Sequence, residues 1–163
     1  MYATPRPLPR VGVVASQRVV PDEDGQLSAV LDPAFDGRHT VVTPKPLAGL
    51  SNTPAQGPAG SARIVTYEPE RVVVDATARR PGELVLTDVH YPGWKATVDG
   101  KPTPIDRVDY LLRGTALAAG RHRVEFRYQP TSYRIGWIIS LLALIGLIAA
   151  LVVGLRRRPT AAR

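Results

Sequence analysis

The side chains best suited to chemistry gather in one short stretch of the chain, residues 88–94. It contains Asp88, His90, Tyr91 and Trp94. A carboxylate and an imidazole two residues apart on a strand share one face of the sheet, because side chains alternate along a strand. Such a pair beside two aromatic rings suits either a sugar-binding edge or a structural hydrogen bond. We favour the structural interpretation and keep glycan contact as the alternative.

Other catalytic and metal-binding chemistries lack the residues they need. The chain has no Cys, which excludes disulfides, thiol catalysis and Cys-ligated zinc. Its three His residues, at positions 39, 90 and 122, do not have metal-ligand spacing. No Gly-rich phosphate loop leads from a strand into a helix, and no Ser or His arrangement resembles a nucleophile site. We therefore expect no catalytic residue, no metal and no cofactor in this chain.

Composition indicates a β-rich chain of one ordinary domain. The 163 residues include 14 Gly and 16 Pro, which favours strands and turns over a helical bundle. The net charge is +7, but four Arg residues lie in the last eight positions, and the rest of the chain carries 17 basic against 14 acidic side chains. So small an excess does not indicate a nucleic-acid partner.

The C-terminal part predicts a membrane-spanning helix over residues 134–156, followed by a basic tail, 157–163. The segment contains 21 consecutive residues without a charge. At about 1.5 Å per residue they extend roughly 31 Å, which matches a hydrocarbon core of about 30 Å. Arg156, Arg157 and Arg158 close the helix and place this end in the cytoplasm by the positive-inside tendency. We expect a single-pass protein of the cell membrane, in contact with the lipid bilayer, whose N-terminal domain is extracytoplasmic.

Small residues line one side of this predicted helix. They recur at close to four-residue spacing, which lets another helix approach closely. We therefore expect other transmembrane helices as partners. The residues of this small-residue stripe are Gly136, Ser140, Ala143, Gly146, Ala150 and Gly154.

The N-terminal 43 residues predict short strands and one short helix of the extracytoplasmic region. Residues 9–20 suggest a pair of short strands. Asp22 and the two acidic residues after it suit the N-terminus of a helix that ends near Asp32. A further strand is expected at 38–43. The Pro- and Gly-rich residues 44–61 then form a loop or linker.

Residues 62–130 predict the core of an antiparallel β-sandwich, so the expected fold is mainly β, with a single C-terminal transmembrane helix. The strand-like runs are short and separated by turn residues, as is typical of sandwiches. These runs are residues 62–68, 71–78, 83–90, 110–118 and 121–128.

Between these runs, Asp99-Gly100 predicts a type I′ hairpin turn. The turn would pair Val98 with Lys101, Ala96 with Thr103 and Trp94 with Ile105. Two prolines, at positions 102 and 104, would then make the second strand a sheet edge that rejects further pairing. In this arrangement Trp94 is most simply a core residue.

The same stretch carries a family resemblance. "YPGWKATVDGKPTPI" (91–105), "AAGRHRVEFRYQPTSYRIGWIISLL" (118–142) and "LDPAFD" (31–36) resemble the C-terminal end of the YfhO-type bacterial membrane proteins. Members are polytopic and similar to GT-C glycosyltransferases, which take sugars from polyprenyl-phosphate carriers outside the membrane. The resemblance implies that this chain corresponds to their extracytoplasmic β-rich domain and final helix. No position matches a GT-C catalytic motif. Residues 106–120 diverge most, with Asp109 where an amide is expected.

The N-terminal sequence bears on how such a domain would cross the membrane. Residues 1–14 contain no apolar signal-peptide core. Either membrane helices precede the domain in a longer protein, as the resemblance implies, or the chain is tail-anchored with its domain in the cytoplasm.

These observations together predict a domain without catalytic activity of its own, accessory to cell-envelope glycosylation by a GT-C-type transferase. One alternative is a membrane-anchored carbohydrate-binding module that presents His90, Tyr91 and Trp94 to an envelope glycan, which requires Trp94 to be exposed. The other is the C-terminal piece of a split glycosyltransferase completed by a partner polypeptide.

Overall fold

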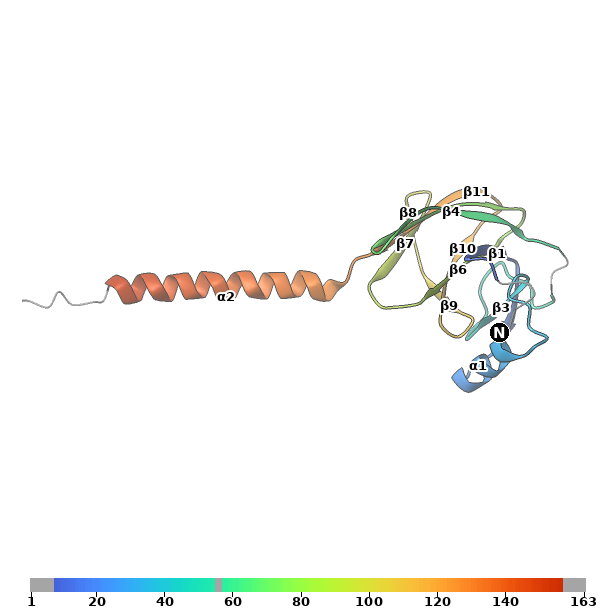
Figure 1. Ribbon diagram of the computed structural model, residues 1–163, viewed down its shortest axis with the longest axis horizontal. Helices are drawn as coiled ribbons and strands as arrows, with labels where there is room; N and C mark the ends of the chain where they lie inside the picture. Colours follow the sequence, from blue (N-terminus) through green and yellow to red (C-terminus); the bar gives the residue numbers. More distant parts are fainter. Residues whose placement is uncertain (1–7, 55–56, 157–163) are drawn as a thin grey trace, which may run out of the picture. The chain divides into compact units, whose positions relative to one another are not determined.

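The computed structural model describes residues 8–54 and 57–156 and divides into two compact units, Met1–Gln129 and Pro130–Arg163. Among these described residues, the first unit contains eleven strands and a short helix, and the second contains one long helix (Figure 1). In chain order the elements are β1 (Val11–Val14), β2 (Ser16–Val19), α1 (Glu23–Leu31), β3 (Thr40–Thr43), β4 (Gly60–Glu68), β5 (Arg71–Ala78), β6 (Gly82–Val89), β7 (Trp94–Val98), β8 (Lys101–Thr103), β9 (Asp106–Val108), β10 (Leu112–Leu117), β11 (Gly120–Tyr128) and α2 (Thr131–Arg156).

Two antiparallel sheets form the sandwich of the first unit. One has the strand order β1-β6-β10-β9 and the other β4-β5-β11-β7-β8. Alternate side chains of both sheets meet in one main core, to which Leu84 and Leu86 come from the first sheet and Val72, Val74 and Phe126 from the second. This confirms the predicted mainly antiparallel β fold. Because the core draws only on residues of the first unit, that unit carries a complete core of its own.

A third, smaller layer covers the outer side of the four-stranded sheet. It contains the parallel pair β2-β3 and a second core cluster around Val14, Val41, Val85 and Val108. Residues 9–20 form two short strands as predicted, but these strands do not pair with each other: β1 pairs with β6, and β2 pairs with β3. Only Ala15 separates β1 from β2, which is too short a connection for a hairpin, so the chain passes from one sheet to another.

Helix α1 forms as its sequence predicts. The side chain of Asp22 accepts a hydrogen bond from the Gly25 amide at 2.6 Å and so caps the helix. Glu23 and Asp24 lie in the first turn, where the helix dipole favours negative charge. The helix ends with Asp32 as its C-cap.

The β7-β8 hairpin also forms as predicted around its turn. Asp99 and Gly100 have φ angles of 51° and 78°, and Val98 pairs with Lys101. Strand β8 ends at Thr103, so the predicted Trp94–Ile105 pair is not made, although both side chains pack against the main core. As predicted, β8 forms one edge of its sheet.

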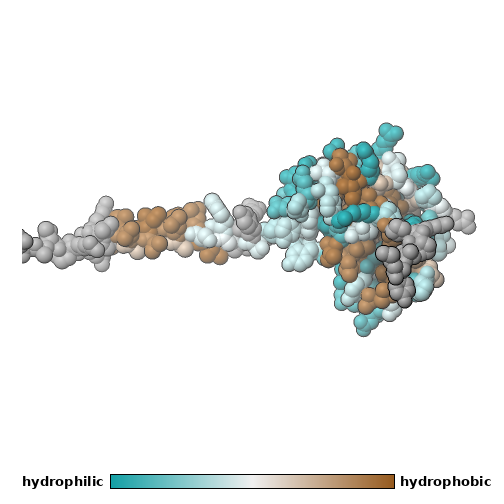
Figure 2. Space-filling model, viewed as in Figure 1, coloured by the Kyte–Doolittle hydropathy of each residue, from teal (hydrophilic) through white to brown (hydrophobic). Residues whose placement is uncertain are grey.

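The second unit consists of α2. Its segment Gly136–Val153 is long and apolar enough to cross a membrane, and within the described helix it is fully exposed. Figure 2 shows apolar side chains along this helix. Five members of the small-residue stripe are described and exposed. The exposure of the sixth, Gly154, and of Arg156 is not described. Arg157 and Arg158 lie outside the described residues.

Candidate functional site

The strongest polar cluster of the first unit lies where strands of both sheets meet. Asp88 comes from the end of β6, Arg113 from β10, Trp94 from the start of β7 and Tyr67 from the end of β4. Together with Thr87 they line a concavity of about 310 Å³. Asp88 and Arg113 point inward because they continue the alternation of the core residues around Leu86.

Asp88 is the centre of this cluster, and its carboxylate is shared among three donors. One oxygen accepts from Arg113 Nη2 at 3.0 Å and the other from Arg10 Nη2 at 3.2 Å. The Tyr67 hydroxyl lies 3.2 and 3.3 Å from the two oxygens and also contacts Arg10. The Arg10 guanidinium lies over the Tyr67 ring, 4.3 Å from its centroid. The carboxylate is therefore occupied by contacts within the domain.

Arg113 is the most deeply buried cation of the cluster, with 4% of its side chain exposed. Its guanidinium carbon lies 4.0 Å from the centroid of Trp94 and 5.8 Å from that of Phe126. Two of its nitrogens, Nε and Nη1, are buried without a hydrogen-bond partner. Cation–π contact with the two rings offsets that loss. Burial lowers the pKa of Arg113, and the neighbouring Asp88 carboxylate opposes the change.

Trp94 is half-buried and already engaged. Arg113 lies over its ring, and the Tyr128 ring contacts it at 5.5 Å between centroids with a 50° tilt. The indole also packs against the main core. These contacts place Trp94 at the margin of the main core, and they leave its ring poorly placed as a platform for a sugar ring.

The structure brings together only two of the four predicted residues, Asp88 and Trp94. Strand β6 ends at Val89, and the next residue turns its backbone amide to the Leu111 carbonyl at 2.6 Å. His90 does not line the concavity. Tyr91 is 61% exposed and lies outside the concavity as well.

Sequence reasoning missed Arg113, Tyr67 and Arg10. Arg113 lies at an inward position of a strand, between Leu112 and Gly114, where an apolar residue is the usual choice. An inward-facing Arg requires a buried counter-charge, and that requirement is the signal that would have pointed to Asp88.

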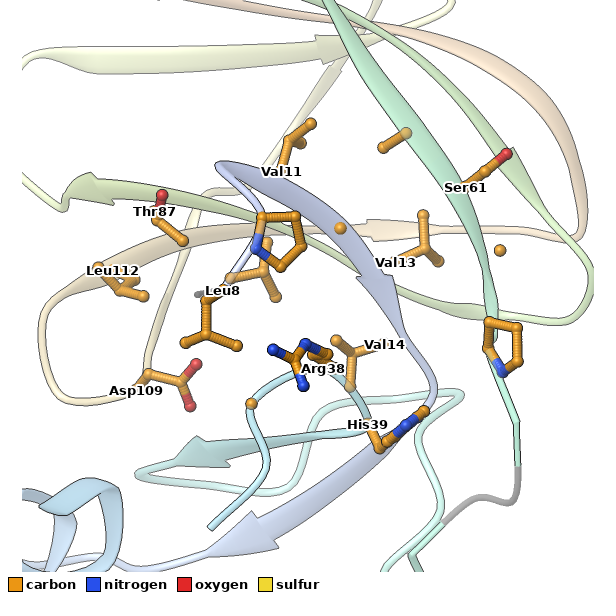
Figure 3. Close-up of a pocket in the computed structure, with 17 residues that line it drawn as sticks. Leu8, Val11, Val13, Val14, Arg38, His39, Ser61, Thr87, Asp109 and Leu112 are labelled. Carbon is orange, nitrogen blue, oxygen red and sulfur yellow. The ribbon is translucent and has the colours of Figure 1, made fainter. Parts of the chain in front are cut away.

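A second concavity, of about 320 Å³, lies beside β1 (Figure 3). Its lining is mostly apolar and includes Leu8, Val11 and Val13, with Asp109 at one side. The Asp109 carboxylate accepts from the Val42 amide at 2.7 Å, and the Asp109 amide donates to the Val42 carbonyl at 2.8 Å. Burial raises the pKa of Asp109 to about 6, and the Val42 hydrogen bond opposes the rise.

Asp109 therefore has a structural explanation. Its φ of 47° lies in the left-handed region, which Asn and Asp tolerate best after Gly. Its carboxylate accepts the same backbone hydrogen bond that the expected amide would accept. Across residues 8–54 and 57–156, no group of three His, Asp or Glu side chains is placed to hold a metal ion.

Comparison with known proteins identifies the family. The model of the family described as "Bacterial membrane protein YfhO" matches residues 47–140, more than half of the chain. The chain is also 25% identical over 96 residues to "Uncharacterized protein YfhO" of Bacillus subtilis (strain 168), a match that covers 59% of this chain and 11% of that protein. The chain therefore spans about a tenth of the length of this relative. No solved structure matches the chain. The chain belongs to the YfhO family of bacterial membrane proteins.

Proposed function

We propose that this chain is a non-catalytic extracytoplasmic β-domain with a membrane anchor, accessory to a GT-C-type transferase of the cell envelope. Membership of the YfhO family supports a membrane protein related to glycosyltransferases. The Arg-rich end of α2 supports a cytoplasmic C-terminus and an extracytoplasmic domain.

One observation supports the non-catalytic role most strongly: the Asp88 carboxylate is bound by side chains of its own domain. A general acid or base must exchange a proton with substrate, at hydrogen-bond distance or through one water. Asp88 instead binds two guanidinium groups and a phenol of its own domain. Nε and Nη1 of Arg113 are buried without a hydrogen-bond partner, and its guanidinium group lies beside the rings of Trp94 and Phe126.

The carbohydrate-binding alternative has less support. Stacking of a sugar needs an open aromatic face, and the ring of Trp94 is engaged by Arg113 and Tyr128. Tyr91 is exposed but lies outside the concavity that Trp94 lines. The split-transferase alternative differs from the accessory role only in whether a partner needs this chain to complete its active site. Both require α2 to dock on a polytopic partner.

Docking through the small-residue stripe is testable by enlarging it. We expect Gly146→Leu combined with Ala150→Leu to abolish co-purification of a polytopic membrane protein with this chain, because bulky side chains prevent close helix approach. The measurement is quantitative mass spectrometry of proteins that co-purify with the chain in mild detergent.

The matched control enlarges the opposite side of α2. Val152 is six residues from Gly146, and at about 100° per residue it lies away from the stripe. We expect Ile145→Phe combined with Val152→Phe to leave co-purification unchanged. Equal loss with both pairs, or retention with both, would contradict docking through the stripe.

A further inference from the structure

The outer face of the five-stranded sheet carries a concentration of positive charge. Cations project from β4, β5, β7 and β11 on the side away from the core, since they alternate with buried residues such as Val74, Ala96, Val124 and Phe126. We call this surface the basic face; its cations are Arg63, Arg71, Lys95, Arg121, Arg123 and Arg127.

Strand register places several of these cations side by side. Arg127 lies directly opposite Arg71 on one neighbouring strand and opposite Lys95 on the other. Like charges directly opposite one another in a sheet are destabilising. Glu125 offsets only part of the repulsion in this row, by contacts of 2.7 Å to Arg71 and 2.6 Å to Arg127.

Three cations of the face have no carboxylate partner among the described residues: Lys95, Arg121 and Arg123. All three are exposed. Arg63 is held loosely by Asp75, at 3.7 Å, with 79% of its side chain exposed. The face is thus left with charge that the domain does not neutralise.

The rest of the domain has the opposite balance. Residues 8–129 contain 15 basic and 14 acidic side chains. The basic face has six of these cations and three carboxylates, at Glu68, Asp75 and Glu125, for a net +3. The remaining nine cations and eleven carboxylates give −2. The positive charge of the domain is therefore concentrated on one sheet face.

This face is tied closely to the membrane by the chain itself. Strand β11, which contributes three of its cations, ends at Tyr128, and α2 begins at Thr131. The three Cα–Cα steps from Tyr128 to Thr131 cover at most about 11 Å. A bilayer that contains α2 is therefore always within reach of the domain, at a high effective concentration.

We infer that the basic face binds the anionic phospholipid headgroups of the membrane in which α2 is embedded. The ligand chemistry is a surface of phosphate groups, which complements the three unpaired cations on this sheet face. Each Lys or Arg near an anionic bilayer strengthens binding by about fivefold, so three together give about 100-fold. Binding of this kind lays the sheet against the headgroups and restricts the orientation of the domain.

The absence of Cys makes the inference directly testable on the full chain. Thr97, which lies on β7 directly opposite Glu125 of the basic face, is replaced with Cys, and Ser28 on α1 is replaced with Cys in a second protein. Each is reconstituted in nanodiscs of phosphatidylcholine, or of phosphatidylcholine and phosphatidylglycerol in equal parts. The rate of labelling by a bulky uncharged maleimide is then measured.

We expect phosphatidylglycerol to slow labelling at position 97 by at least about tenfold and to leave position 28 unchanged. The combination Lys95→Gln, Arg121→Gln and Arg123→Gln should restore fast labelling. A matched combination elsewhere, Lys45→Gln, Arg18→Gln and Arg80→Gln, removes the same charge and should leave the protection intact. High salt should also remove the protection.

Three results would overturn the inference. Equal labelling rates in both lipids mean that the face does not bind headgroups. Slow labelling of position 97 even in nanodiscs that contain only phosphatidylcholine means that protein or an apolar contact covers the basic face. Protection in phosphatidylcholine by added soluble poly(glycerol phosphate), with no protection by phosphatidylglycerol, means that the face binds a phosphate polymer instead of the bilayer. Circular dichroism confirms that each variant is folded.

Discussion

Asp88→Asn lowers the free energy of unfolding of the domain by about 3–5 kcal/mol, the loss expected when one partner of a buried ion pair is removed. Arg113 has 4% of its side chain exposed and depends on Asp88 for its counter-charge. Without the carboxylate, the guanidinium is a buried charge with two unpartnered nitrogens already present. The measurement is urea denaturation of residues 8–129, followed by circular dichroism.

Glu125→Gln is the matched control, because it removes a carboxylate that also binds two Arg residues. Its partners, Arg71 and Arg127, are 40% and 52% exposed, so water screens the pairs. We expect a loss below about 1 kcal/mol. Similar losses of unfolding free energy for the two variants would show that the cost of removing Asp88 does not come from the burial of Arg113.

Between pH 4.5 and pH 7, the Glu83→Gln variant gains about 3 kcal/mol in unfolding free energy relative to the unsubstituted domain. Glu83 is 1% exposed, beneath the third layer, and its Oε1 has no hydrogen-bond partner. Burial, followed by repulsion from Asp106, raises its pKa from 4.5 to about 9. A side chain at Gly114 would collide with the Glu83 carboxyl, so the glycine provides the room that it occupies.

The sign follows from the two states of Glu83. The unfolded chain loses this proton near pH 4.5, whereas the folded domain keeps it until about pH 9. The contribution of Glu83 to stability is therefore complete below pH 4.5 and declines as the pH rises toward 9. Gln does not titrate, so the unfolding free energy of the Glu83→Gln variant does not decline in this way. Urea denaturation at several pH values measures the difference.

The control for Glu83 is Glu70→Gln, the same chemical change at an exposed side chain. We expect its unfolding free energy to follow that of the unsubstituted domain across the pH range. If Glu83→Gln also gives a curve parallel to that of the unsubstituted domain, Glu83 is not the protonated buried group that this structure describes.

Local signals in the sequence predicted the elements whose structure depends on near neighbours. The alternation of residues 121–128, the Asp99-Gly100 turn and the Asp22 cap all appear as expected. Strand partners depend on residues far along the chain, which is why the pairing within 9–20 was wrong. Ala15 is too short a link for a hairpin, yet β1 and β2 each find a distant partner.

In the candidate site, too, only residues close together in the sequence could be predicted. Asp88 and Trp94 could be found because they are close in sequence and differ in type from their neighbours. Arg113, Tyr67 and Arg10 reach Asp88 from separate elements, and no short motif joins them. His90 follows the last residue of β6 and does not line the concavity that Asp88 and Trp94 line.

We propose that the Asp88 cluster stabilises the domain and takes no part in sugar transfer. The most direct test is the transfer of sugar to the cell envelope, per folded molecule, by cells that make the proposed transferase together with this chain carrying Asp88→Asn and Arg113→Met. Removing both charges avoids an isolated buried ion, so this double variant should fold. We expect transfer close to that of the unsubstituted protein. A folded double variant that has lost transfer would contradict it.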